Sequence, residues 1–219
     1  MVRAVAFDLW HTLAAWPDEK SVALRQRWGE SLGASPGRID EVWGETDLYR
    51  LRETGPIATA IAALGQRLGV ELDVESILAG RLELTRRALV PVEGAVSTLA
   101  ELRRRGVATA LISNCTEDVV LAWEHSPFAG LFDAEVFSAT AGCMKPERRI
   151  YELALGELGF GGSDCLFVGD GANEELSGAR DVGMTPVLVC PDGDEPLWEG
   201  VRDWSGLRVA SIPQVLALV

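Results

Sequence analysis

The sequence is poor in the side chains that bind transition metals or form disulfides. Its 219 residues include four cysteines and two histidines, which show neither a Cys-x-x-Cys pair nor the spacing of zinc ligands. We therefore expect reduced, mostly buried thiols, as in a cytosolic protein. The chain also lacks any apolar run near the roughly 20 residues that span a bilayer. Its apolar beginning is broken by Asp8, too early for a signal peptide, so we predict a cytoplasmic location.

Positive charge is scarce as well, and the formal net charge is -13 at pH 7. Affinity for nucleic acid depends on Lys and Arg side chains that neutralise phosphates, so we expect no nucleic-acid partner. The same charge disfavours docking on anionic membranes. With 47% hydrophobic and 24% charged residues, the composition is ordinary for a globular protein with a sizeable core. The length fits one domain with an insert, or two small domains.

Short apolar runs that end in polar residues predict a parallel β-sheet. The first run, Val2–Phe7, is followed by Asp8. Three further runs, at 107–112, 165–168 and 185–189, end at Ser113-Asn114, Gly169-Asp170 and Cys190-Pro191-Asp192. Helical patterns at 93–105 and 147–158 lie between them. This alternation predicts an α/β fold with a doubly wound parallel sheet, in which ligands bind at the carboxyl ends of the strands.

Residues 14–92 interrupt the alternation. They contain no convincing strand but four helical segments, at 18–32, 36–53, 56–68 and 74–89, the last with a capping region at Asp73 and Ser76. We therefore predict a core made of residues 1–13 and 93–219, with an all-helical domain of residues 14–92 inserted into it. The insert carries a net charge of -2 and the core -11, so the acidity belongs to the core.

Four short stretches lie at or after the predicted strands: Phe7–Leu13 (FDLWHTL), Ile112–Asn114 (ISN), Met144–Glu147 (MKPE) and Phe167–Glu175 (FVGDGANEE). In their order and spacing they resemble the motifs of the haloacid dehalogenase superfamily, a large group dominated by phosphohydrolases. The resemblance covers essentially the whole chain. It implies a Rossmann-like core and a helical cap, inserted between the first and second motifs, that closes over the site and supplies specificity.

The resemblance also assigns roles to side chains of the first three motifs. It implies that Asp8 is the nucleophile that forms an aspartyl-phosphate, and that Lys145 pairs with it as a fixed positive charge. It implies that Ser113 hydrogen-bonds a phosphoryl oxygen, with Asn114 as a second donor. Thr12 stands at the threonine of the first motif and is counted among the substrate-binding residues. Only two of the 20 basic residues are lysines, which favours a specific role for Lys145.

The fourth motif resembles the magnesium site of the family. The resemblance implies that Asp170 binds Mg²⁺ together with Asp8 and the backbone carbonyl of Trp10, an oxygen-only set that suits this cation. An acid four or five positions after Asp170 completes the motif. We take Glu174 as the ligand, while the spacing leaves Glu175 open. The alternative interpretation is an exposed acidic helix start that the helix dipole favours.

Trp10 departs from the commonest pattern of the family. Its phosphatases carry an aspartate there that protonates the leaving group and then activates water, whereas an indole offers only a donor N–H. Losing a general acid typically costs about 10²–10⁴-fold in rate when the leaving group is poor. Three explanations stay open: a leaving group that needs no proton, such as an acyl phosphate, a C–P bond or a halide; another donor, with His11 the nearest; or a slow or inactive enzyme.

The first and fourth motifs point to different activities. The dehalogenases of the family also lack the second aspartate and resemble this chain in an aromatic residue there, but they use no metal and lack the acid at the position of Asp170. We therefore expect a Mg²⁺-dependent phosphatase of a small metabolite, strongly dependent on the cation. The alternatives are a metal-independent 2-haloacid dehalogenase that forms an ester on Asp8, and a catalytically degenerate binding protein.

The partner of this chain is expected to be a small, phosphorylated molecule, since a closing cap leaves no room for a protein substrate. Candidate contacts in the cap are its arginines and aromatic residues: Arg25, Arg27, Arg50, Arg52, Arg86, Arg87, Trp28, Trp43 and Tyr49. We expect a monomer or a homodimer.

Overall fold

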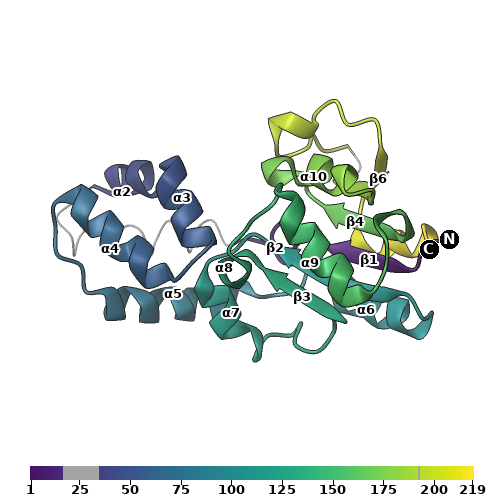
Figure 1. Cartoon of the computed structure of the whole chain (residues 1–219), viewed down its shortest axis with the longest axis horizontal. Helices are drawn as coiled ribbons and strands as arrows, with labels where there is room; N and C mark the ends of the chain where they lie inside the picture. The colour runs from purple at the N-terminus through teal and green to yellow at the C-terminus, as the bar shows by residue number, and fades with distance from the viewer. Residues whose placement is uncertain (17–34, 192) are drawn as a thin grey trace.

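The computed structural model describes residues 1–16, 35–191 and 193–219. Figure 1 shows two bodies side by side, a sheet flanked by helices and a separate group of helices labelled α2 to α5. The first body is the core and the second is the cap. No helix in the described part of the chain has the length and apolar character needed to cross a bilayer.

Six parallel strands form a single sheet in the order β3-β2-β1-β4-β5-β6. They are β1 (Ala4–Phe7), β2 (Ala108–Ser113), β3 (Ala134–Phe137), β4 (Cys165–Gly169), β5 (Thr185–Val189) and β6 (Leu207–Val209). β1 lies between β2 and β4, and all four of its side chains are buried because both faces of the sheet are covered. This confirms the predicted doubly wound α/β core.

The edge strand β3 is absent from the sequence prediction. Its four residues, Ala-Glu-Val-Phe, are too few to show a clear periodicity, and they become a strand by pairing with β2 from Ala134 to Phe137. The short strand β6 is followed by a 3-10 helix, η4 (Ile212–Ala217).

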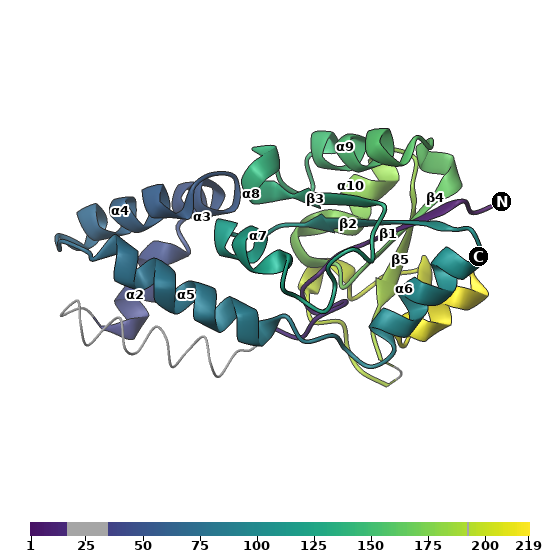
Figure 2. The same cartoon turned by 90° about the horizontal axis from the view of Figure 1, so that it is seen from below.

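Helices cover the sheet on both faces. They are α6 (Ala95–Arg104), α7 (Glu117–Trp123), α8 (Ser138–Ala141), α9 (Arg148–Leu158) and α10 (Glu175–Asp181). In Figure 2, α9 and α10 lie on one side of the strands, and α6 lies on the other side with the C-terminal segment. Side chains of β1 pack into both layers, because Phe7 belongs to one hydrophobic cluster and the neighbouring Ala6 to the other.

The described residues of the cap form four helices and their connections. Its helices are α2 (Pro36–Trp43), α3 (Thr46–Glu53), α4 (Ile57–Leu68) and α5 (Val74–Ala88), around a small core of its own that includes Ile39, Leu48 and Ile61. The segment predicted as one helix over 36–53 is two, with a break after Trp43. The predicted capping residue Asp73 accepts a hydrogen bond from the Ser76 N–H at 3.0 Å. The predicted helix at 18–32 lies outside the described residues.

The two connections between core and cap run together. The Val92 N–H donates to the Leu13 carbonyl at 2.8 Å, and Ala14 and Pro91 form an antiparallel bridge. These contacts lie next to the predicted boundaries after residues 13 and 92. They bring both linkers past the end of β1, where Asp8 begins the loop that follows.

Gly94 tests how closely α6 packs on the C-terminal segment. Its φ of +79° is in the left-handed region, and a Cβ there would lie 2.4 Å from Cγ of Pro213. We expect G94A to lose about 2–4 kcal/mol of unfolding free energy, from backbone strain and overpacking together. The control is G106A, at φ +73° with nothing within 4 Å of the added atom, which should lose about 1 kcal/mol. Urea unfolding measures both, and equal losses would contradict the packing argument.

Candidate active site

Polar residues gather at the carboxyl end of the central strands. Asp8 follows β1 and Asp170 follows β4, while Ser113 ends β2. Phe7 pairs with both Val168 and Leu111, so these three strands end at the same edge of the sheet. Lys145 comes from the loop before α9, and Glu175 is the first residue of α10. The fold therefore brings together residues that are up to 167 positions apart in the sequence.

Lys145 is the centre of the cluster. Its side chain is 2% exposed, and its ammonium group donates hydrogen bonds to Asp8 Oδ1 and, at 2.6 Å, to Glu175 Oε2. Burial alone would lower the pKa of this ammonium, but the Asp8 and Glu175 carboxylates outweigh burial and hold the pKa above its usual value. Lys145 is therefore charged at neutral pH. The sequence predicts the Asp8–Lys145 pairing, and the structure contains it.

Three buried carboxylates surround this single ammonium. Asp8, Asp170 and Glu175 each place an oxygen within 4.8 Å of the others. Burial raises the pKa of Asp8, with Lys145 opposing and Asp170 adding to the rise. Burial and the Asp8 charge raise the pKa of Glu175 well above its usual value. The cluster is short of positive charge when all of its groups are ionised.

Glu175, and not Glu174, belongs to this cluster, so the geometry favours Glu175 where the sequence analysis chose Glu174, and the metal ligand itself stays a prediction. Asn173 and Glu174 both adopt left-handed backbone conformations, with φ of 50° and 55°. This double turn leaves the Glu174 side chain exposed and brings Glu175 inside, fully buried. The Gly171 N–H donates to Glu175 Oε1 at 3.0 Å. Sequence spacing alone did not reveal the turn, because neither residue is a glycine.

Asn114 holds the backbone of Lys145. Its Nδ2 donates to the Lys145 carbonyl at 3.0 Å, and its Oδ1 accepts from the Lys145 N–H at 2.7 Å. Tyr151, which sequence reasoning missed, supports the other side, where its hydroxyl donates to the Glu175 carbonyl at 2.8 Å. Asn114 also lines the cavity beside the cluster. Its clearest structural task is thus to position the ammonium, in addition to the predicted contact with substrate.

Ser113 and Thr12 lie behind the cavity surface. Both are buried, and neither is among the described residues that line the cavity. The Ser113 hydroxyl donates to the Asn114 carbonyl over a long 3.4 Å. The Thr12 hydroxyl is buried with no hydrogen-bond partner in the described part of the chain. Their predicted contacts with a substrate stay predictions.

Trp198 and His11 lie near Asp170 and Asp8. The sequence did not predict that these two residues would lie together. Trp198, from the segment before β6, donates its indole N–H to Asp170 Oδ2 at 2.6 Å. The ring of His11 lies 6.3 Å from the Trp198 ring, and both residues line the cavity. His11 has a φ of 57°, which is uncommon for a residue with a side chain. The side chain that sequence reasoning named as the nearest alternative proton donor therefore faces the site.

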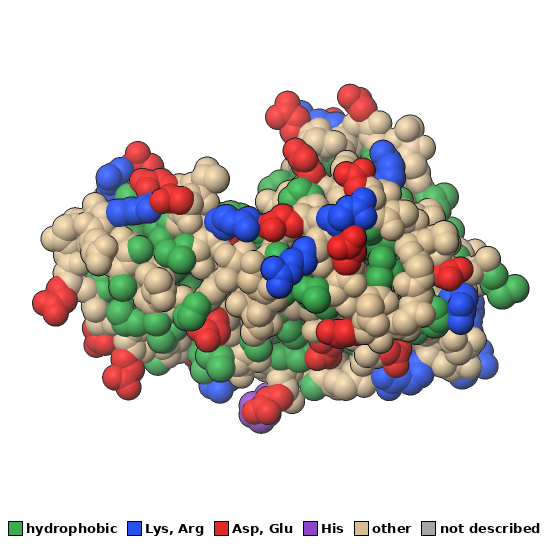
Figure 3. Space-filling model, viewed as in Figure 1, with side chains coloured by type: hydrophobic (Ala, Val, Ile, Leu, Met, Phe, Trp, Pro, Cys, Tyr) green, Lys and Arg blue, Asp and Glu red, His purple; other side chains and the backbone are tan. Residues whose placement is uncertain are grey.

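A cavity of about 450 Å³ connects the cluster to the cap. In Figure 3 the outline of the molecule is notched between the two bodies. On the cap side the lining includes Trp43, Tyr49, Arg52, Glu53 and Arg81. The size suits a small molecule, since ligand sites usually enclose about 300–1,000 Å³.

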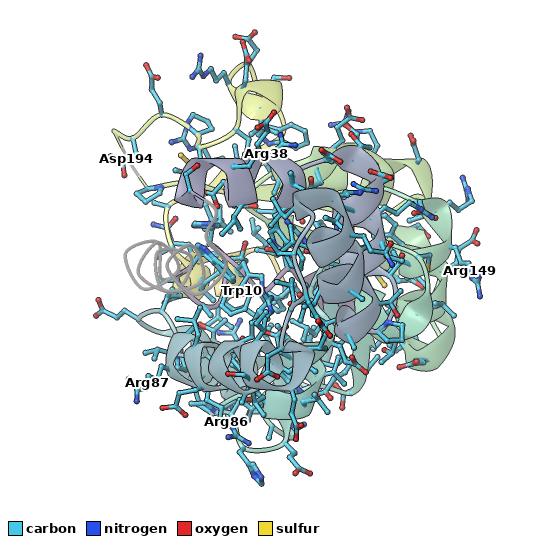
Figure 4. All side chains as sticks on the ribbon, turned by 90° about the vertical axis from the view of Figure 1, so that its left-hand side faces the viewer. Trp10, Arg38, Arg86, Arg87, Arg149 and Asp194 are labelled. Atoms are coloured by element: carbon cyan, nitrogen blue, oxygen red, sulfur yellow. The ribbon has the colours of Figure 1, made fainter. Side chains whose placement is uncertain are left out.

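The cap arginines predicted to contact substrate fall into three groups. Arg52 lines the cavity. Arg50 pairs instead with Glu147 at 2.6 Å, in an exposed position. Arg86 and Arg87 are also exposed, and Figure 4 shows them pointing outward while Trp10 lies near the centre of the view from the cap side. Arg25, Arg27 and Trp28 lie outside the described residues. The sequence did not single out Arg81, because its place on the inner face of α5 depends on how that helix packs.

Arg81 joins the cap to the core. From α5 it donates to Asp118 of α7 at 3.0 Å and to the Thr116 hydroxyl at 2.8 Å, and Thr85 also donates to Asp118. Burial alone would raise the pKa of Asp118, but Arg81 and these hydrogen bonds hold it below its ordinary 3.8. The ion pair is almost fully enclosed, so it contributes to stability chiefly by leaving neither charge unpaired.

This ion pair predicts a pH-dependent stability. Because folding lowers the pKa of Asp118, the folded state binds fewer protons, and the stabilisation is complete above pH 3.8 and lost as the pH falls below it. We expect D118N to lose about 3 kcal/mol at neutral pH. The difference in unfolding free energy between wild type and D118N should shrink as the pH is lowered from about 6 to about 3. Urea unfolding across that range measures it, and a gap independent of pH would contradict the assignment.

The chain resembles known proteins of one family over most of its length. A family model described as haloacid dehalogenase-like hydrolase matches residues 2–183. The glyceraldehyde 3-phosphate phosphatase of Methanothermobacter thermautotrophicus is 33% identical over 136 residues, 59% of this chain and 58% of that protein. The (S)-2-haloacid dehalogenase of Pseudomonas sp. strain YL is 29% identical, with 99% of this chain and 94% of that protein covered.

Solved structures also match the fold over nearly the whole chain. A phosphatase structure from Thermococcus onnurineus matches 99% of this chain and 97% of its own with a TM-score of 0.72, at 19% identity. The chain spans about half the length of the first curated relatives that it matches. These relatives are named as phosphatases or hydrolases, whereas the dehalogenase matches nearly end to end. The match of the family model and the architecture together show that this chain is a hydrolase of the haloacid dehalogenase-like family.

Proposed function

We propose that the protein is a Mg²⁺-dependent phosphohydrolase that acts on a small molecule through an aspartyl-phosphate on Asp8. The observation that carries this proposal is the cluster of Asp8, Asp170 and Glu175 around one ammonium. Three buried carboxylates with one cation leave a deficit of positive charge. A divalent cation would remove this deficit, and a phosphoryl dianion would otherwise be repelled.

The donor set fits magnesium. Its members are carboxylate oxygens, which hard cations prefer, and the cluster contains no thiol or imidazole. Asp8, Asp170 and Glu175 would hold the ion, with the Trp10 carbonyl as the predicted fourth contact. When bound, the cation supplies charge neutralisation for the phosphoryl group. Glu175 also keeps Lys145 in place, so it would serve both the ammonium and the metal.

The residues of the chain account for most of the reaction. Lys145 holds Asp8 by a hydrogen bond to Oδ1 and stabilises its ionised form. An oxygen of Asp8 attacks phosphorus, and the bond from phosphorus to the leaving oxygen breaks with both electrons passing to that oxygen. Water then cleaves the aspartyl-phosphate, which releases inorganic phosphate and restores Asp8. The aspartyl-phosphate divides the displacement into two steps.

Proton transfer is the step for which this chain departs from the phosphatases of its family. Trp10 has no group that can take up or release a proton at neutral pH. His11 faces the cavity and is the alternative donor. A leaving group that departs without a proton is the second explanation, and a slow or inactive enzyme is the third. The leaving-group dependence of the rate separates the first two.

The second candidate is hydrolysis of a 2-haloacid through an ester on Asp8. Trp10 and the end-to-end relative from Pseudomonas favour it. Asp170 argues against it, because a third carboxylate near the nucleophile repels a carboxylate substrate. Chloride release from 2-chloropropionate, measured with and without a chelator, tests this candidate directly.

Magnesium should bind to the folded chain and stabilise it. At a Mg²⁺ concentration of about 100 times Kd the gain is about 2.7 kcal/mol for a ligand that binds only the folded state. We expect wild type to show this rise in thermal unfolding, and D170N and E175Q to lose most of it. E174Q is the matched control, since Glu174 is the exposed neighbour, and it should behave as wild type. An equal effect of E174Q and E175Q would refute the assignment.

Phosphoryl transfer should require both Asp8 and the cation. With acetyl phosphate as substrate, we expect turnover that stops when Mg²⁺ is chelated and a trapped protein species heavier by one phosphoryl group. D8N should abolish both, and D170N should lower turnover by about 10²-fold or more. The measurement is phosphate release combined with intact-protein mass spectrometry after acid quench. Chloride release that survives chelation would select the dehalogenase instead, and inactivity in both assays would favour the binding protein.

A further inference from the structure

Five aromatic side chains line the cavity between the carboxylate cluster and the cap. We call this the aromatic wall, and it consists of Trp10, Trp16, Trp43, Tyr49 and Trp198. Trp10 and Trp16 meet edge to face, with ring centroids 4.8 Å apart and planes at 88°. These rings come from both bodies of the molecule. A substrate in this cavity therefore meets flat, weakly polar surfaces on several sides.

The charges among these rings are already matched. Arg52 lies between the Trp43 and Tyr49 rings, 4.9 and 4.7 Å from their centroids, and pairs with the buried Glu53. Arg81 pairs with Asp118. Among the described residues that line the cap side, two cations thus face two anions, and their charges sum to zero. This arrangement favours a substrate whose second half is uncharged, in contrast to the phosphoryl end beside Lys145.

The chemistry at Trp10 points to the same kind of substrate. Without a carboxylate at this position, and with no proton supplied by His11, the leaving oxygen departs as an anion, so its basicity sets the rate. A phenol has a pKa near about 10, whereas an alkyl alcohol is closer to water, at about 15.7. An aryl oxide therefore leaves far more readily than an alkoxide. Trp10 both removes the acid and adds a ring to the wall.

We propose that the substrate is an aryl phosphate, the phosphate monoester of a flat, uncharged aromatic alcohol. Its ring lies against the aromatic wall and its phosphoryl group lies at Asp8. A bond forms between an Asp8 oxygen and phosphorus while the bond from phosphorus to the aryl oxygen breaks. The aryl oxide takes a proton from water, and a second water hydrolyses the aspartyl-phosphate. This inference rests on the proposed phosphohydrolase function and names its substrate class.

Three small substrates separate the two parts of the proposal. Phenyl phosphate and benzyl phosphate share a ring but differ in the basicity of the leaving oxygen. Acetyl phosphate has a good leaving group but no ring. We expect kcat/KM to be at least about 10²-fold higher for phenyl than for benzyl phosphate. We also expect a KM for phenyl phosphate at least about tenfold below that for acetyl phosphate, because stacking on the wall is worth on the order of 1 kcal/mol or more per aromatic contact.

Two variants at one position isolate the missing proton donor. W10D and W10N remove the same ring and have side chains of nearly equal size, but only W10D supplies a carboxyl group. We expect W10D to narrow the gap between phenyl and benzyl phosphate by about tenfold or more, and W10N to leave it wide. Both should raise the KM for phenyl phosphate, since both remove one ring from the aromatic wall. Circular dichroism and thermal unfolding establish that both variants fold.

The outcomes distinguish this inference from the proposed function. Turnover of acetyl phosphate with no preference for phenyl phosphate would overturn the aryl substrate and leave the phosphohydrolase intact. Equal rates for phenyl and benzyl phosphate, with benzyl turnover lost in H11Q, would show that His11 supplies the proton and would also overturn it. No phosphoenzyme with any of the three would refute the phosphohydrolase itself.

Discussion

The hydrogen-bonded ammonium of Lys145 is the interaction on which the site depends. It lies between Asp8 and Glu175, almost fully buried, and it is the cation through which two carboxylates can share so small a space. Removing charges from water is costly unless they are paired and hydrogen-bonded. Asn114 and Tyr151 meet this requirement indirectly, because they fix the backbones that carry the ammonium and Glu175.

The same balance divides the cavity into two regions. At the sheet edge, carboxylates outnumber the ammonium, so the surplus is negative and calls for a cation. At the cap, Arg52 and Arg81 are each matched by an acid, and the rings of Trp43 and Tyr49 also line the cavity. The net charge of the chain is thus a poor guide to its ligand. The local charge that a ligand meets is set by which charged side chains are paired at each end of the cavity. This pairing acts over distances far shorter than the molecule.

Much of the site follows from strand ends alone. Asp8 and Asp170 could be placed together because parallel strands deliver their carboxyl ends to one edge, and the fold could be predicted from the same runs. The prediction failed where geometry depends on contacts that are distant in sequence. The edge strand at Ala134–Phe137 exists by pairing with β2, and the choice of Glu175 over Glu174 depends on two left-handed residues. Arg81 and Trp198 reach the cavity through packing that no local pattern encodes.

The pairing of the two linkers has a consequence for how the chain could change. Because Leu13 and Val92 are hydrogen-bonded and Ala14 lies against Pro91, the cap leaves and re-enters the core as a two-stranded stalk. An insert whose ends adjoin can be lengthened, shortened or exchanged without altering the register of the sheet. The core can therefore keep its catalytic residues while the inserted cap is replaced, and a different cap can provide a different substrate specificity.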